Sequence, residues 1–69
     1  MNINRISSFV KELKTYGEDV VIITTGNTVI MTSSKTSLRK LTVDLDATAA
    51  YYGMKMRLKG DHECDFYSE

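Results

Sequence analysis

The stretch VVIITTGNTVIM, residues 20–31, is the densest run of β-branched and large aliphatic side chains in the sequence, and the pair Gly26-Asn27 interrupts it once. Glycine and asparagine both tolerate the positive φ angles that a two-residue primed turn requires. Such a turn also matches the twist of the strands on either side of it. The stretch is therefore predicted to form the β-hairpin around which the rest of the chain is organised.

The turn sets the register of this hairpin and so decides which side chains share a face. One face is predicted to carry the cross-strand pairs Thr25 with Thr28, Ile23 with Ile30 and Val21 with Thr32. The opposite face is predicted to carry Thr24 with Val29 and Ile22 with Met31. Because both faces are partly apolar, we expect the chain's own helices to cover one of them and a second layer or a partner to cover the other.

A first helix, residues 4–16, is predicted before the hairpin, because apolar residues recur there at helical spacing. Asn2 or Asn4 can cap its start, and Gly17 is expected to end it as a left-handed cap. The apolar stripe consists of Ile6, Phe9, Val10, Leu13 and Tyr16.

A second helix, residues 36–52, is predicted after the hairpin, with possible N-caps in the loop 33–37 and an end at Gly53. Residues 40–46 also alternate between apolar and polar side chains, so a strand is the alternative there. The helix is preferred because it accounts for more of the apolar residues and for the alanine-rich part of the stretch. Its stripe consists of Leu38, Leu41, Leu45, Ala49 and Tyr52.

A second hairpin is predicted at the end of the chain. Met54, Met56 and Leu58 alternate with Lys55, Arg57 and Lys59, as in a half-buried strand with one basic face. A two-residue loop would set carboxylates on the apolar face of the returning strand, whereas a three-residue loop, residues 60–62, avoids this. The second register is preferred, and it pairs Leu58 with Cys64, Met56 with Phe66, Lys59 with Glu63, Arg57 with Asp65 and Lys55 with Tyr67.

The predicted fold is α+β, with the order α-ββ-α-ββ and a four-stranded antiparallel sheet that carries both helices on one face. The chain has no proline and no low-complexity segment, so residues 1–69 are expected to form a single domain without linkers. A chain of 69 residues buries only about 60% of its unfolded surface, and its one cysteine, Cys64, excludes an internal disulfide. Extra burial is therefore expected from a homodimer or a bound partner.

Composition also limits the compartment and the partners. A single cysteine, the lack of a long apolar run and the lack of a signal-peptide pattern favour a cytoplasmic protein with no membrane partner. The net charge is zero, so there is no overall electrostatic attraction to nucleic acid. The charge is uneven, however: residues 35–59 sum to +4 (six Lys and Arg against two Asp), and residues 61–69 sum to −4 (four Asp and Glu).

The sequence contains no convincing catalytic or metal-binding constellation. His62 and Cys64 supply only two of the ligands that a zinc site needs, and a strand gives them no convergent geometry for nucleophilic catalysis. Asp44 and Asp46 would project about 200° apart on a helix, so they do not form an acid–base pair. No glycine-rich phosphate loop is present. We expect no enzymatic activity, no cofactor and no bound metal.

Two kinds of surface can be built from the basic strand. Lys55, Arg57 and Lys59 near Tyr51 and Tyr52 combine the phosphate contacts and stacking platforms of a nucleic-acid site. The carboxylates and the tyrosine of the returning strand lie opposite the same basic residues and cancel much of their field. A structural or protein-binding role is therefore preferred for this surface.

Residues 17–34, GEDVVIITTGNTVIMTSS, resemble the helix-to-hairpin region of the Phd and YefM type antitoxins. The positions that match without gaps are Gly17, Glu18, Val20, Ile22, Gly26, Val29 and Ser34. The resemblance implies one short helix before the hairpin and one after it, a dimer that binds DNA, and a tail that binds a toxin. The sequence departs from the family where Thr24 and Thr25 replace basic residues and Thr28 replaces a proline.

Taken together, these features favour a small non-enzymatic protein that occupies a surface of a partner protein, as an inhibitor or antitoxin of a phage or mobile element does. The alternative is a dimeric nucleic-acid-binding transcriptional regulator. The predicted partner interface consists of Val21, Ile23, Ile30, Lys55, Arg57, Lys59, Glu63, Asp65 and Tyr67.

Overall fold

The computed structural model of the protein describes residues 3–68, with side chains from residue 5 onward. Its elements in chain order are α1 (Ile3–Lys14), β1 (Val21–Thr25), β2 (Thr28–Thr32), the 3₁₀ turn η1 (Arg39–Leu41), α2 (Thr42–Tyr51), β3 (Lys55–Leu58) and β4 (Glu63–Tyr67). The predicted α+β class and the order α-ββ-α-ββ are therefore confirmed.

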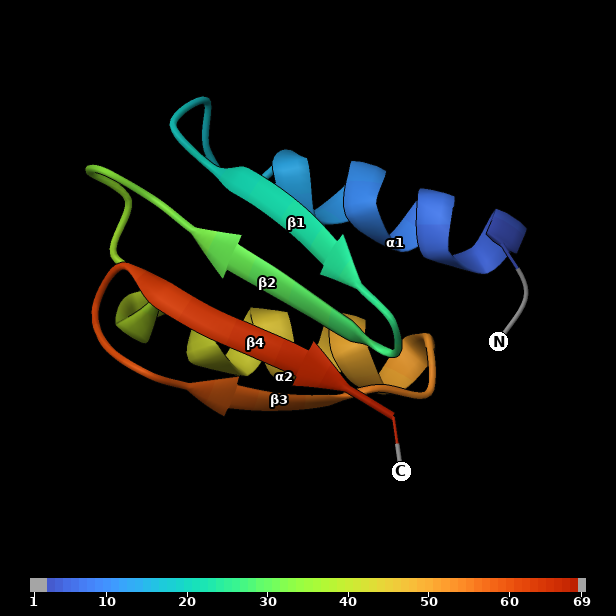
Figure 1. Ribbon diagram of the computed structural model, residues 1–69. Helices are drawn as coiled ribbons and strands as arrows, with labels where there is room; N and C mark the ends of the chain where they lie inside the picture. Colours follow the sequence, from blue (N-terminus) through green and yellow to red (C-terminus); the bar gives the residue numbers. More distant parts are fainter. Residues whose placement is uncertain (1–2, 69) are drawn as a thin grey trace.

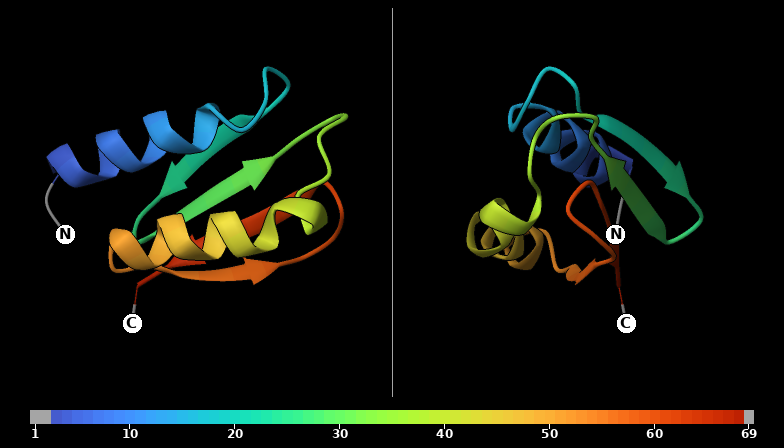
Figure 2. Two further views of the ribbon diagram at one scale, coloured as in Figure 1. Left: turned by 180° about the vertical axis from the view of Figure 1, so that it is seen from behind. Right: turned by 90° about the vertical axis from the view of Figure 1, so that its left-hand side faces the viewer.

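The four strands form one antiparallel sheet in the order β1-β2-β4-β3 (Figure 1). The second strand of each hairpin lies inside, and the first strand of each hairpin forms an edge. Both helices lie on the same side of this sheet, α1 beside β1 and α2 beside β3, as the views in Figure 2 show. The other side of the sheet, which faces the viewer in Figure 1, carries no helix formed by residues 3–68.

Both predicted hairpin registers are confirmed. In the first hairpin Ile23 lies opposite Ile30, with the two-residue turn at Gly26-Asn27 and a φ of 56° at Gly26. In the second hairpin Arg57 lies opposite Asp65 after a three-residue loop. Its closing amides, those of Lys59 and Gly60, both donate to the Glu63 carbonyl, at 3.0 and 3.1 Å.

The core lies between the helices and the covered face of the sheet. Phe9 of α1 is fully buried and stacks edge-to-face on Phe66 of β4, with ring centroids 5.1 Å apart. Tyr52 contacts the same Phe9 ring at 5.1 Å. The buried apolar residues are Phe9, Leu13, Val20, Val29, Met31, Leu38, Leu45, Ala49, Met54, Cys64 and Phe66. The covered face is thus the one that carries Val29 and Met31, and the two helical stripes predicted from the sequence meet there.

The helix ends differ from the predicted ones. Helix α1 ends at Lys14, and Gly17 does not have a positive φ, so the expected left-handed cap is wrong at this position. Gly17 is needed for space instead, because a Cβ there would lie against the Thr36 hydroxyl and 2.9 Å from Asp19 Oδ1. Gly53, with a φ of 72°, does have the left-handed conformation predicted for it.

Residues 40–46 are helical, so the alternative of a strand there is wrong. The regular part of α2 begins at Thr42 rather than at residue 36, and no side chain of the loop 33–37 caps it. The hydroxyls of Ser34 and Thr36 bond to Asp19 and that of Ser37 to Asp61, and the cap position of α2 is Leu41. The predicted caps of the first helix, the side chains of Asn2 and Asn4, lie outside the described residues.

Within residues 3–68, no helix is long and apolar enough to cross a membrane.

Candidate partner-binding face

The nine residues predicted as a partner interface all lie on the side of the sheet without helices. Register explains this, because residues directly opposite one another in neighbouring strands share a face. One row across the sheet runs Ile23, Ile30, Asp65, Arg57, and the rows on either side carry Val21 with Glu63 and Tyr67 with Lys55. Lys59 follows directly after β3. We call this surface the open face and define it by Val21, Ile23, Ile30, Lys55, Arg57, Lys59, Glu63, Asp65 and Tyr67.

The half of the open face on β1 and β2 is apolar and accessible. Val21 and Ile23 are 55% and 52% exposed, and Ile30 beside them is half-buried. The same register also places on this face three threonines that were not among the predicted interface residues, Thr25, Thr28 and Thr32. Their period-two spacing from Ile23 and Ile30 was the signal that could have identified them.

Asp65 is the centre of the charged half on β4 and β3. It is only 9% exposed, and Lys59 Nζ and Arg57 Nε lie 3.6 and 4.0 Å from its two carboxylate oxygens. Both distances are those of ion pairs rather than hydrogen bonds. Its Oδ1 is buried and accepts no hydrogen bond from the described residues. The Arg57 guanidinium also lies over the Tyr67 ring, 4.9 Å from the centroid.

The backbone register of β3 and β4 is the predicted one, but one ion pair differs from the expected partner. Lys59 lies opposite Glu63, yet its ammonium group pairs with Asp65, the diagonal neighbour. Diagonal neighbours on one face of a twisted sheet remain within reach of a long side chain. One carboxylate therefore serves two cations, and the basic residues of the open face, Lys55, Arg57 and Lys59, outnumber its carboxylates, Glu63 and Asp65, by one.

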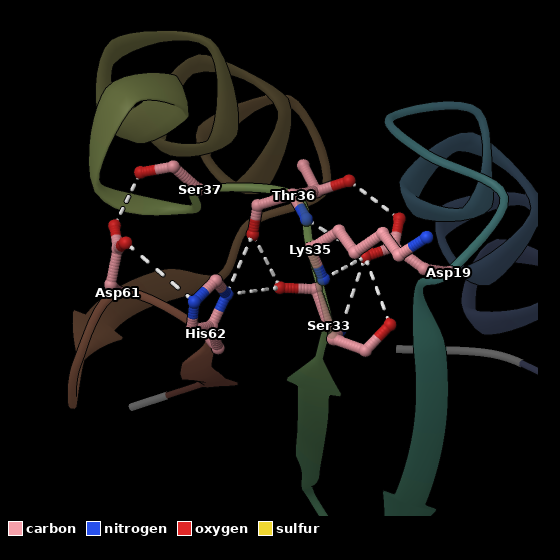
Figure 3. A network of polar contacts seen from close by, with 8 residues as sticks. Asp19, Ser33, Lys35, Thr36, Ser37, Asp61 and His62 are labelled. Carbon is pink, nitrogen blue, oxygen red and sulfur yellow. Dashed lines mark hydrogen bonds and ion pairs between the residues drawn. The ribbon is translucent and has the colours of Figure 1, made fainter.

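A network of polar contacts joins the loops at one end of the sheet (Figure 3). The Asp19 carboxylate accepts hydrogen bonds from the amides of Ser34, Lys35 and Thr36, at 3.0, 2.5 and 2.8 Å, and from the Thr36 hydroxyl at 2.6 Å. Hydrogen bonds from the Thr36 hydroxyl and from the amides of Thr36 and Lys35 hold the pKa of Asp19 well below its usual range. This network was not predicted from the sequence, because the residues that form it are far apart in the chain.

The other side of the same loop is bound by the turn between β3 and β4. Nδ1 of His62 lies 3.1 Å from the Thr36 carbonyl and 3.3 Å from the Ser33 hydroxyl, and the Ser37 hydroxyl donates to Asp61. That hydrogen bond from Ser37 also lowers the pKa of Asp61. His62 therefore serves as a structural link between two loops.

Cys64 is fully buried on the covered face, as predicted, and burial raises the pKa of its thiol to about 12. A thiol that remains protonated and inaccessible is a poor nucleophile and a poor metal ligand. Within residues 3–68, no three His, Cys, Asp or Glu side chains lie close enough together to hold a metal ion.

A small cavity of about 60 Å³ lies near the turn of the first hairpin, and its lining includes Ile6, Val29 and Met54. Pockets that enclose small organic ligands measure about 300–1,000 Å³, so this cavity has room for little more than water.

Comparisons of the chain with models of known protein families, with curated proteins and with solved structures find no match in any of the three. The resemblance of residues 17–34 to the Phd and YefM type antitoxins therefore stays a prediction. The function is therefore inferred from the residues of the open face.

Proposed function

We propose that this protein is a non-enzymatic protein-binding module that acts by occupying a surface of a partner protein, as inhibitors and antitoxins do, and that the open face is its binding surface. The observation that carries the proposal is the convergence of all nine interface residues on the one side of the sheet that no helix covers.

The composition of the open face supports this role. Protein interfaces combine an apolar centre with charged and polar surroundings, and they are enriched in arginine and tyrosine. Ile23 and Ile30 supply the apolar part, and Arg57 stacked on Tyr67 supplies an aromatic and cationic anchor. A sheet with one wet face carries polar side chains there, so exposed isoleucine and valine on such a face favour a covering partner.

Asp65 gives a second reason. A buried acceptor without a hydrogen-bond donor costs about 1–3 kcal/mol, and Asp65 Oδ1 is such an acceptor among the described residues. A partner that covers the open face would exclude water from Asp65 and its two cations and so strengthen their attraction.

The proposal can be tested by affinity capture from the cells that encode the protein, with the wild-type chain and two matched variants. Ile23→Lys places a charge in the apolar half of the open face, and Val43→Lys makes the same kind of change at an 81% exposed position on α2. We expect Val43→Lys to retain the captured partner protein and Ile23→Lys to lose it. The proposal is wrong if Ile23→Lys retains the partner or if only Val43→Lys loses it.

The alternative of a dimeric nucleic-acid-binding regulator predicts a different result. Mixed-sequence DNA or RNA would bind tightly, and the affinity would fall steeply with salt and disappear when Lys55, Arg57 and Lys59 are all changed to Ala. We expect weak or no binding near physiological salt, because the net charge is zero and Asp65 partly neutralises two of the three cations. Fluorescence anisotropy with labelled duplex and single-stranded probes measures this directly.

A further inference from the structure

Strand β3 is an edge of the sheet, and among the described residues no strand lies on its outer side (Figure 1). The Lys59 amide donates to the Glu63 carbonyl, at 3.0 Å, which sets the phase of the ladder between β3 and β4. Because backbone groups alternate in direction along an antiparallel ladder, those of Met56 and Leu58 point away from β4. Outward-pointing amides and carbonyls on an edge are a ready template for another strand.

The side chains of β3 alternate in a way that would select such a strand. Arg57 and Lys59 are exposed on the open face, with Lys55 in the same row. Met56 and Leu58 are half-buried on the covered face, where they pack against the core. A strand added beside β3 would therefore meet cations on one side and the border of the apolar core on the other.

Strand β4 shows which sequence fits beside β3, because it already occupies the inner edge. Its residues alternate between acidic and apolar, and the register sets Asp65 opposite Arg57 and Cys64 opposite Leu58. Arg57 and Lys59 reach Asp65 only at ion-pair distances of 4.0 and 3.6 Å. Both cations thus retain donors for a second carboxylate on the outer side of β3.

We infer that the outer edge of β3 binds an extended segment of a partner protein in which acidic residues alternate with apolar ones. The segment pairs with the outward backbone groups of Met56 and Leu58, sets its carboxylates beside Arg57 and Lys59, and extends the apolar core with its other side chains. This inference rests on the proposed protein-binding function and deepens it, since it names the chemistry of the partner and the edge that receives it.

A second copy of this chain is a poor occupant of the same edge. Antiparallel pairing of β3 with β3 of another molecule would set basic residues directly against basic residues, and like charges opposite each other destabilise a pair of strands. The same cations that attract an acidic segment therefore prevent β3 from pairing with itself.

The test uses a synthetic peptide of about ten residues, a common length for a strand, in which Glu and Asp alternate with Val and Phe. Amide hydrogen exchange of the full chain is followed by NMR with and without this peptide. We expect the amides of Met56 and Leu58 to exchange rapidly in the free protein and to become protected in the complex. Loss of protection in β4 would mean instead that the peptide displaces β4, and it would overturn the inference.

Two sets of controls separate strand addition from non-specific attraction. N-methylation of the peptide amides that face β3 should abolish binding, whereas N-methylation of the alternate amides should leave it unchanged. Lys59→Glu should weaken binding about tenfold, and a peptide with Lys in place of only the acidic residue that lies beside position 59 should restore it. Lys11→Glu on α1 makes the same charge change away from the edge and should have no effect. The N-methylated peptides test the inference even if a charge variant folds poorly.

Equal effects of the two N-methylation patterns, or unprotected Met56 and Leu58 amides at saturating peptide, would overturn the inference. Displacement of the peptide by single-stranded DNA near physiological salt would also overturn the inference, because it would show that Arg57 and Lys59 bind phosphate groups. The proposed function is tested separately by Ile23→Lys in affinity capture. If that experiment succeeds and the peptide fails, only the edge of β3 is rejected; if both fail, the protein-binding role is rejected as well.

Discussion

At the scale of single residues, Asp19 decides how the loops at one end of the sheet are joined. Its carboxylate accepts hydrogen bonds from three backbone amides and two hydroxyls of residues 34–36, and those from Thr36 and Lys35 lower its pKa. Gly17 lies in the same place, where a Cβ would meet the Thr36 hydroxyl. The conformation of the loop 33–37 therefore depends on the Asp19 carboxylate and on the lack of a side chain at Gly17, both in a segment distant in sequence.

We expect Asp19→Asn to lower the free energy of unfolding at neutral pH. The NH₂ group of the asparagine cannot accept the hydrogen bonds that the backbone amides of residues 34–36 donate to the carboxylate. The folded-state pKa of Asp19 is below that of the unfolded chain, so its contribution is fully present above about pH 4 and is lost as the pH falls through the folded-state value. The difference between wild type and variant should therefore shrink in acid. Urea unfolding at several pH values measures it, with Asp46→Asn, an exposed position on α2, as the control. An equal loss for both variants would contradict the role of Asp19.

Cys64 is the second residue whose surroundings lead to a clear expectation. It is fully buried, and its thiol pKa is raised to about 12, first by burial and then by the charges of Asp65 and Glu63. We expect a thiol reagent such as DTNB to react with it only when the protein unfolds. A Ser8→Cys variant, with a second thiol on the exposed side of α1, should label at once. Rapid labelling of Cys64 in the native protein would contradict its burial on the covered face.

At the scale of elements, the last hairpin combines a buried carboxylate with two cations from one edge strand. Arg57→Glu would set a second carboxylate beside Asp65, which is only 9% exposed. We expect a loss of about 1–3 kcal/mol in the free energy of unfolding, more than the 0.2–1 kcal/mol typical of exposed pairs. The exchange Arg57→Glu with Asp65→Arg should recover much of this loss, as urea unfolding can measure.

The matched control for this hairpin is Lys11→Glu on α1, which should change stability by less than about 0.5 kcal/mol. The double variant should also recover stability more readily than partner binding, because binding depends on which strand carries each charge. Additive losses in the two single variants, with no recovery in the double one, would mean that Arg57 and Asp65 do not interact.

At the scale of the whole molecule, the exposed apolar half of the open face, on β1 and β2, predicts that the protein associates with itself when no partner is present. Ile23 projects on the open face and Ile22 on the covered face, so the same substitution at these two neighbours tests the two faces separately. We expect Ile23→Lys to weaken association without loss of stability, and Ile22→Lys to destabilise the fold by about 1–3 kcal/mol. Light scattering over a concentration series and thermal unfolding measure the two effects. A strict monomer at high micromolar concentration, with both variants tolerated, would exclude the open face as a self-association surface.

The element types, both hairpin registers and the division of side chains between two faces could be predicted from the sequence, because each depends on residues close together in the chain. The turn at Gly26-Asn27 sets the register of its own two strands. In the last hairpin only the register with a three-residue loop keeps the carboxylates of β4 off the apolar face. The nine residues of the open face were found in this way, one hairpin at a time.

What only the tertiary structure decided is how the two hairpins join. The pairing of β2 with β4 sets Ile30 beside Asp65 and so unites an apolar half and a charged half in a single surface. The pairing of Lys59 with Asp65 and the network around Asp19 also depend on contacts between distant segments or on the twist of the sheet. Local sequence patterns do not encode such contacts. The entropy cost of bringing distant segments together is offset by the burial of the whole core rather than by the few residues that meet.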